Sequence, residues 1–347
     1  MYLTRKETLL QYEALEKTFD YLLSERDRVK RAFAGELARL LFIGCGSGYY
    51  LCQSAAVSAT LRLPVHGMAM AAGDLMLNGF RYQGLMPNTL LVAPSRSGST
   101  SEVLEAIKYG KANGARAIGI AAKEDSPLEE LVEECFVLPW AFDEAVCQTK
   151  TVTNLYTANL ILMALVADDK TLLAEIEQAI KRGPEFMERW EETSKEIAKA
   201  DWSRVVVLAD GELEGIAAEA ALAFAEICQA PASYHHVLDV RHGPMVLIRE
   251  DTLVIMASTG QEEMHQKQLV EDLQGRGAKV VVVGPVGSDW KANWYVSVPA
   301  YEHYGVTGIP FIYIPQSVSF FKAMERGINP DVPDGLDAWI ELPSSEK

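Results

Sequence analysis

The sequence predicts an α/β fold made of two tandem, doubly wound domains, each with a parallel sheet between two layers of helices. Short, continuous apolar runs, typical of parallel strands buried on both faces, alternate with helical stretches. The alternation occurs twice, and equivalent apolar positions in the two halves are Leu41 and Val206, Leu91 and Val254, and Ile118 and Val281. Their offsets of 163 to 165 residues indicate a duplicated domain.

The first expected element is a helix over residues 4–33, where Thr4 and Glu7 match a capping box and apolar residues recur at helical spacing. Strands are expected at residues 40–44, 89–94, 117–122, 136–139, 205–209, 252–257, 279–284, 295–298 and 311–314. Helices are expected between them, and a charged helical stretch is interrupted at Gly183-Pro184. The resulting division is an N-terminal helix (1–36), a first domain (37–169), linker helices (170–200) and a second domain (201–347).

The chain carries 32 basic and 48 acidic residues, a net charge of −16. The negative electrostatic field that results from this net charge would repel nucleic acid. We therefore expect any bound phosphate to be one small group, held locally by N–H groups and hydroxyls. No apolar run is long enough to span a membrane, and charged residues follow Met1 closely, so neither a membrane segment nor a secretory signal is expected. The five cysteines show no paired or metal-type spacing, which favours a reducing, cytoplasmic location.

The hydroxyl-rich segment at residues 95–100 lies between an expected strand and the next helix, where such sheets bind ligands. Gly98 allows the backbone to turn, and the new helix offers unpaired N–H groups. The hydroxyls of Ser95, Ser97 and Thr100 can face one oxyanion. The segment therefore predicts a phosphate site in the first domain.

The alternative is a loop that only caps the helix, because Ser99 and Glu102 match a capping box. In the second half, residues 258–262 carry acidic side chains at the equivalent place, so only the first half is equipped for an anion. A second glycine-rich loop, residues 44–48, lacks the third glycine and the acidic residue of a dinucleotide site. It places Ser47 where it could share the phosphate, although a tight turn without a ligand has the same pattern.

Residues 216–228 form an almost wholly apolar helix that should be buried. Glu219 and Glu226 lie on one face of it. A buried carboxylate needs a partner or a raised pKa, and a raised pKa suits a general base near neutral pH. We interpret Glu226 as the functional carboxylate and Glu219 as structural. A pair of surface glutamates at a subunit edge is the alternative.

His242 stands in a His-Gly-Pro turn, where an imidazole can point into a cleft. A hydrogen-bonded turn residue without a function is the alternative. His235, His236 and Asp239 lie nearby, but their spacing matches no zinc pattern, so no metal site is expected.

Together, the loops 44–48 and 95–100, the Val-Cys-Gln-Thr-Lys stretch at 146–150, Glu226 and the Arg-His-Gly-Pro turn resemble the sugar isomerase (SIS) family. The similarity covers most of the chain and includes the isomerase half of glucosamine-6-phosphate synthase. It also includes the stand-alone amino-sugar-phosphate deaminases and fructosamine-6-phosphate deglycases. The resemblance implies two SIS-type domains.

The resemblance also implies a role for each residue. The phosphate would be bound by Ser47, Ser95, Arg96, Ser97 and Thr100, and the sugar by Gly46, Val146, Cys147 and Gln148. Glu226 would move a proton between C1 and C2 of the open-chain sugar, and His242 would assist ring opening or protonate a leaving nitrogen. In the family this histidine comes from the neighbouring subunit, which implies a homodimer with composite active sites. No cofactor is implied.

Two positions depart from the synthase pattern. Arg96 replaces a glutamine between the two phosphate-loop serines, and its guanidinium would add a charge-assisted contact to the phosphate. Ala338 stands where the synthase has a lysine that handles the open-chain sugar. The chain is also too short for a glutaminase domain, and residue 2 is Tyr instead of a nucleophilic Cys, so glutamine-dependent synthesis is not expected.

We therefore expect an enzyme of the phosphosugar isomerase or deaminase type, which acts on a 6-phosphorylated sugar or amino sugar and releases an amine or ammonia. A plain aldose–ketose isomerase and a non-catalytic sugar-phosphate sensor are the alternatives. The N-terminal region predicts a single helix instead of a DNA-binding domain, and Glu226 and His242 are both present, which favours an enzyme over a sensor.

Overall fold

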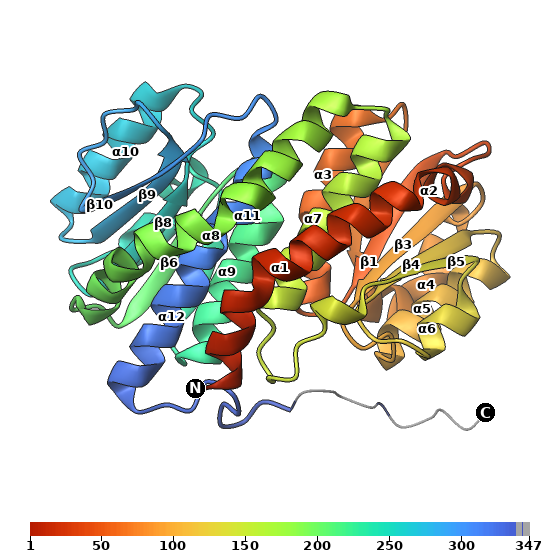
Figure 1. Ribbon diagram of the computed structural model, residues 1–347, viewed down its shortest axis with the longest axis horizontal. Helices are drawn as coiled ribbons and strands as arrows, with labels where there is room; N and C mark the ends of the chain where they lie inside the picture. The colour runs from red at the N-terminus through yellow and green to blue at the C-terminus, as the bar shows by residue number, and fades with distance from the viewer. Residues whose placement is uncertain (338–341, 343–347) are drawn as a thin grey trace. The chain divides into compact units, whose positions relative to one another are not determined.

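The computed structural model describes residues 1–337 and 342 (Figure 1). The chain forms two compact units. The first unit is made mainly of Glu13–Ala174, and the second of Met1–Tyr12 together with Glu175–Leu336. Each unit contains one parallel sheet of five strands, so the predicted pair of doubly wound α/β domains is confirmed.

The first unit has the strand order β2-β1-β3-β4-β5. The strands are β1 (Arg39–Gly44), β2 (His66–Ala71), β3 (Thr89–Ser95), β4 (Arg116–Ala121) and β5 (Glu134–Val137). The helices are α2 (Arg26–Ala32), α3 (Ser47–Arg62), α4 (Ala72–Tyr82), α5 (Ser101–Ala112), α6 (Pro127–Leu131) and α7 (Lys150–Val166), with short 3-10 turns η1 (Gln83–Leu85) and η2 (Pro139–Ala141). Apolar side chains of α4, α5 and α6 pack on one face of the sheet, and α3 and α7 lie on the other (Figure 1).

The second unit has the strand order β10-β9-β8-β6-β7. The strands are β6 (Arg204–Leu208), β7 (Ala232–His235), β8 (Thr252–Ala257), β9 (Lys279–Pro285) and β10 (Trp294–Val298). The helices are α9 (Glu214–Ile227), α10 (Glu263–Gly275), α11 (Gly308–Phe311) and α12 (Tyr313–Arg326), with 3-10 turns η3 (Gly211–Leu213), η4 (Asp239–Arg241), η5 (Pro244–Leu247) and η6 (Tyr304–Thr307). Helix α10 packs on one face of the sheet, and α9 packs against β6, β7 and α12. Two further helices, α1 (Leu3–Ser24) and α8 (Lys170–Lys199), contribute residues to both units.

The duplication extends to the strand register. Equivalent neighbours pair in the two sheets: Leu41 with Leu91 and Val206 with Val254, then Val92 with Ile118 and Ile255 with Val281. In each sheet the strand order reverses once, between β1 and β3 in the first unit and between β6 and β8 in the second. Ligands of open parallel sheets bind outside the carboxyl ends of the strands at such a switch point.

One predicted strand is wrong, and two observed strands were not predicted. The expected strand at 311–314 is wrong, because these residues belong to the helical segment of α11 and α12, where Phe311 and Tyr313 are fully buried. A short apolar run does not distinguish a strand from a buried helix. Strands β2 and β7 were missed, because they are half-exposed edge strands and lack a continuous apolar run.

The N-terminal region differs from the expected single helix over 4–33. The helix breaks at Glu25, which has φ −91° and ψ 13°, and α2 follows. The capping box of Thr4 and Glu7 is not formed. Instead the carboxylate of Asp331 accepts the N–H groups of Leu3 and Thr4, both at 2.8 Å.

The linker is one continuous helix, α8, in place of two helical pieces separated at Gly183-Pro184. A proline in a helix interior removes one hydrogen bond, but packing can retain it. Gly183 lies so close to Tyr12 that a Cβ would be 2.0 Å from the ring, which explains the glycine at this position. No helix within the described residues is both long and apolar enough to cross a membrane.

Candidate functional site

Residues 95–100, called the phosphate loop after the role predicted for them, form a tight turn between β3 and α5. The N–H of Gly98 donates to Ser95 Oγ at 2.9 Å, and the N–H of Ser99 donates to Ser97 Oγ at 3.2 Å. Gly98 has φ +61°, which favours glycine. Both serine hydroxyls thus help to shape the loop, and each still has a proton that it can donate.

Helix α5 starts directly after the phosphate loop, with Thr100 as its N-cap residue. In the described structure no side chain caps this helix end, so the capping box of Ser99 and Glu102 is not formed. This disfavours the alternative of a loop that only caps the helix. The N–H groups of Ser101 and Glu102, the first two residues of the helix, have no carbonyl of the helix within reach and lie at the positive end of its dipole. Ser95 and Ser97 are buried beside them.

The second glycine-rich loop lies next to the phosphate loop, because β1 and β3 are neighbouring strands. Gly46 has φ +52°, and Ser47 is buried at the first position of α3. A Cβ on Gly48 would lie 3.1 Å from the carbonyl oxygen of Pro94, at the end of β3. The structure therefore brings Ser47 and the phosphate loop to the same edge of the sheet, at its switch point.

The residues predicted to face the sugar, Val146, Cys147 and Gln148, lie in the 144–149 loop between η2 and α7. Cys147 is completely buried, whereas Val146 and Gln148 are half-buried. Arg96 extends to this loop, where its Nη1 donates to the carbonyl oxygen of Val146 at 3.0 Å and to that of the preceding residue at 2.8 Å. The predicted phosphate and sugar residues thus meet in the first unit. A contact of Arg96 with phosphate remains a prediction.

Sequence reasoning missed Asp143, which directly precedes the 144–149 loop and is completely buried. Its Oδ2 accepts the N–H groups of Thr149 at 2.7 Å and Thr151 at 2.8 Å. Burial raises the pKa of Asp143, and the N–H donors act in the opposite direction. No local pattern marks this residue, since its partners become neighbours only when the loop closes.

Cys45 and Glu102 lie at the same edge of the first sheet and were not predicted as site residues. The pKa of Cys45 is raised to about 11, mainly by burial and next by the negative charge of Glu102. The N–H groups of Gly73 and Ala72 act in the opposite direction. Within the described residues, the buried Oε2 of Glu102 has no hydrogen-bond partner. The thiol is therefore protonated near neutral pH, and the carboxylate can accept a further donor.

The apolar helix predicted at 216–228 is α9 in the second unit, and most of its residues are buried as expected. Glu219 is 2% exposed, and Glu226, next to the last helical residue, is half-buried. Glu219 is thus the more deeply buried of the two carboxylates. The half-buried position of Glu226 near the helix end suits a group that must reach a substrate.

His242 lies in the second unit, in the turn between η4 and η5. It is exposed, and its N–H donates to the carbonyl oxygen of Asp239 at 2.8 Å. Large apolar side chains next to it are also exposed: Leu238 is 42%, Val246 68% and Leu247 58% exposed. The turn therefore offers an imidazole and an apolar surface to solvent together.

The two neighbouring histidines have separate partners. His236 Nδ1 lies 2.9 Å from Asp210 Oδ1, and its Nε2 lies 3.8 Å from Glu214 Oε2. His235 Nε2 lies 3.2 Å from Ser233 Oγ, and burial lowers its pKa. No group of three or more His, Cys, Asp or Glu side chains within the described part of the chain could hold a metal ion.

The chain is similar to known enzymes over most of its length. The chain is 27% identical over 354 residues to glutamine–fructose-6-phosphate aminotransferase (isomerizing) of Shewanella oneidensis, covering 95% of this chain and 57% of that protein. The enzyme of the same name from Methanothermobacter thermautotrophicus is 26% identical over 323 residues, covering 89% and 52%. The chain thus spans about half the length of the curated relatives it matches.

Solved structures have the same fold. Glucosamine-6-phosphate deaminase from Thermotoga maritima superposes with a TM-score of 0.83 at 25% identity, over 98% of this chain and 100% of that one. Tagatose-6-phosphate ketose/aldose isomerase from Escherichia coli gives a TM-score of 0.85 at 21% identity, over 99% and 97%.

The two sheets, each with one reversal of strand order, make this a tandem α/β protein. The hydroxyl-lined loop at residues 95–100 lies at the reversal in the first sheet. The SIS domain family matches residues 36–167 and 197–288, which together make up more than half of the chain. The chain belongs to this family, and the family predicted from the motifs is confirmed.

Proposed function

We propose that the protein is a phosphosugar isomerase-type enzyme that acts on a 6-phosphorylated sugar or amino sugar. The main support is the arrangement at the first switch point, where the buried hydroxyls of Ser47, Ser95 and Ser97 lie beside the N-terminal ends of α3 and α5. In a chain with a net charge of −16, such a local supply of hydroxyl and N–H donors suits one phosphate group. Membership of the SIS family supports the same substrate class.

The proposed chemistry is a proton transfer followed by release of an amine. Glu226 takes a proton from C1 or C2 of the open-chain sugar and returns it to the other carbon. The C–N bond thereby becomes an imine, which water hydrolyses to a carbonyl group and a free amine. His242 assists ring opening or protonates the leaving nitrogen. Ala338, at the position of the synthase lysine, lies outside the described residues.

The proposal includes a cytoplasmic homodimer in which His242 is supplied to the partner's site. The exposure of His242 among the apolar side chains of Leu238, Val246 and Leu247 supports an interface at this turn. None of the five cysteines, all within the described residues, forms a disulfide, as suits a reducing compartment.

Ligand binding combined with product analysis tests the proposal. Fructose 6-phosphate or a 6-phospho amino sugar should raise the melting temperature, whereas the unphosphorylated sugars should not. A Ser97→Ala/Thr100→Ala variant should bind more weakly by about 2–4 kcal/mol, because one or two charge-assisted contacts are lost. Thr259→Ala, at the equivalent loop of the second unit, is the matched control and should bind normally.

The outcomes separate the alternatives. Equal stabilisation by glucosamine and glucosamine 6-phosphate would contradict the phosphate site. Turnover without release of ammonia or an amine from any amino-substituted substrate would indicate a plain aldose–ketose isomerase. Tight binding of phosphosugars, without turnover and without deuterium uptake at C1 or C2 in D₂O, would favour a sensor.

A further inference from the structure

The 144–149 loop is fixed at its base by Asp143. The Oδ2 of this completely buried side chain accepts the N–H groups of Thr149, the last residue of the loop, and of Thr151, in the first turn of α7, at 2.7 and 2.8 Å. The N–H of Asp143 donates in turn to Thr151 Oγ1 at 3.0 Å. One carboxylate therefore joins the residue before the loop to the end of the loop and to the start of α7.

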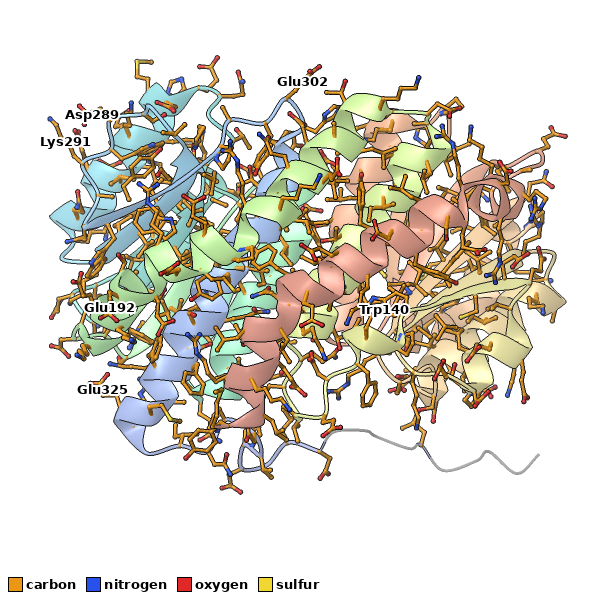
Figure 2. All side chains as sticks on the ribbon, in the orientation of Figure 1. Trp140, Glu192, Asp289, Lys291, Glu302 and Glu325 are labelled. Carbon is orange, nitrogen blue, oxygen red and sulfur yellow. The ribbon has the colours of Figure 1, made fainter. Side chains whose placement is uncertain are left out.

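The segment that leads into the loop is anchored as well. The indole N–H of Trp140, labelled in Figure 2, donates to Thr18 Oγ1 at 2.8 Å. Thr18 donates to Asn154 Oδ1 on α7 at 2.6 Å. All of these residues belong to the first unit, so both ends of the 144–149 loop start from fixed positions.

The middle of the loop is held by the phosphate loop itself. Arg96 is 8% exposed, and its Nη1 donates to two successive loop carbonyls, that of Val146 included. A guanidinium in this position places a positive charge on the carbonyl side of the loop. Because Arg96 belongs to residues 95–100, its two hydrogen bonds make the backbone of the 144–149 loop depend on the conformation of that segment.

Asp143 is suited to position the loop, because its carboxylate is completely buried and hydrogen-bonded to the chain. Its Oδ1 is buried and has no hydrogen-bond partner within the described residues, while its Oδ2 accepts two N–H groups of the chain. Burying a carboxylate is costly unless its oxygens accept hydrogen bonds, and the N–H groups of Thr149 and Thr151 offset part of this cost. The task that the contacts indicate is closure of the loop.

We propose that Arg96 and Asp143 are positioning residues that couple the two loops, so that an anion bound at residues 95–100 fixes the backbone of the 144–149 loop. This inference deepens the proposed function and rests on it, because the 144–149 loop is taken to contact the sugar. Binding of the phosphate group would then order the sugar-contacting backbone of the same unit. Phosphorylated substrates would be favoured twice, by direct contacts and by this ordering.

Amide hydrogen exchange at the loop tests the inference. Wild type, Asp143→Ala, Asp143→Asn and Arg96→Met are compared without ligand and with saturating inorganic phosphate or fructose 6-phosphate. Without ligand, Asp143→Ala should exchange the amides of Thr149 and Thr151 at least about tenfold faster, because both lose their acceptor. Asp143→Asn should remain close to wild type, because its amide oxygen accepts the same two N–H groups.

Thr157→Val is the matched control for loss of a buried polar group. Thr157 is fully buried on α7, and its hydroxyl donates within the helix to Thr153. This variant should leave exchange in the loop unchanged. Inorganic phosphate should slow exchange at residues 145–149 in wild type but not in Arg96→Met. For turnover, Asp143→Ala should raise KM about tenfold or more, and Asp143→Asn should restore it.

Each result decides a different point. Unchanged exchange at Thr149 and Thr151 in Asp143→Ala would overturn the role of Asp143, whether or not a ligand is known. Equal protection by saturating phosphate in wild type and Arg96→Met would overturn the coupling while leaving the proposed function intact. If wild type bound neither phosphate nor phosphosugars, the proposed function and the coupling would both be overturned. The comparison of exchange rates without ligand would still decide the role of Asp143.

Discussion

At the scale of single residues, the cysteines show how burial sets reactivity. Cys45 is the most exposed of the five and lies beside the proposed phosphate site. Its pKa is raised to about 11, first by burial and then by Glu102. Cys228 is fully buried, and its pKa is also raised to about 11 by burial. A thiol with so high a pKa is a poor nucleophile at neutral pH, so neither side chain fits covalent catalysis.

We expect Cys45 to react slowly with iodoacetamide in the folded protein, at a rate that increases about tenfold per pH unit between pH 7 and 10, as the thiolate fraction does. Glu102→Gln should lower the pKa of Cys45 and raise its labelling rate about two- to tenfold, because a nearby negative charge is removed. Mass spectrometry of the labelled peptides measures both effects. Labelling of Cys228 is the internal control and should not respond to Glu102→Gln. Rapid, pH-independent labelling of Cys45 would contradict the raised pKa.

At the scale of elements, local patterns predicted the turn at residues 95–100 and the strand and helix that flank it, which together form one segment of the candidate site. The serines of the phosphate loop are close in sequence, and their strand was recognised from its apolar run. The contacts of the 144–149 loop were not predictable. Arg96 donates to carbonyl groups that are 49 and 50 residues away in sequence, and Asp143 accepts N–H groups six and eight residues ahead in an irregular loop that no sequence pattern marks. Strands β2 and β7 were missed for a related reason: an edge strand needs fewer apolar residues than a central one.

The phosphate loop also depends on its contact with the next loop. Gly98 has φ +61°, and a Cβ there would lie 2.4 Å from Ser126 Oγ and 2.5 Å from its Cβ. Ser126 belongs to the capping box of α6 together with Glu129. A side chain on Gly98 would therefore strain the phosphate loop and displace the start of α6 at the same time.

Gly98→Ala should lower the free energy of unfolding by about 2–4 kcal/mol, the combined cost of a left-handed conformation and of overpacking. It should also abolish stabilisation by phosphosugars. Gly84→Ala is the control, because no atom lies within 4 Å of the added Cβ and no positive φ is required. Urea denaturation with and without fructose 6-phosphate measures both quantities. Wild-type stability and binding in Gly98→Ala would show that the loop tolerates a side chain.

At the scale of the whole molecule, the two units share a fold but differ in the loop that is equivalent to residues 95–100. The second unit has a turn at the equivalent place, where the N–H of Gly260 donates to Ser258 Oγ at 3.2 Å, two residues back. In the first unit the N–H of Gly98 donates to Ser95 Oγ, three residues back, so the two turns differ in detail. Its following helix, α10, starts with two carboxylates, those of Glu262 and Glu263, whereas α5 starts with the hydroxyls of Thr100 and Ser101 and has one carboxylate, Glu102, in its first turn. Carboxylates at a helix N-terminus occupy the place that an anion would take. We therefore expect one phosphosugar site per chain, in the first unit.

Glu226 and His242, the two residues proposed to act in catalysis, both belong to the second unit. His242 is exposed beside Val246 and Leu247, as expected for a residue that completes the site of a partner subunit. Glu226→Gln and His242→Ala should each be nearly inactive alone, with losses of about two to four orders of magnitude in kcat. In a hybrid of the two variants, one site would contain both substituted residues and the other would be intact.

Co-expression of the two variants should therefore restore activity to about a quarter of wild type, because random pairing makes half of the dimers hybrids with one working site each. Separately tagged chains allow the hybrid to be purified, and its activity per dimer should be about half that of wild type. If both residues acted within one chain, neither subunit of a hybrid would hold an intact pair, and activity would remain at the level of the single variants. A chain that sediments as a monomer at micromolar concentration would contradict the dimer itself.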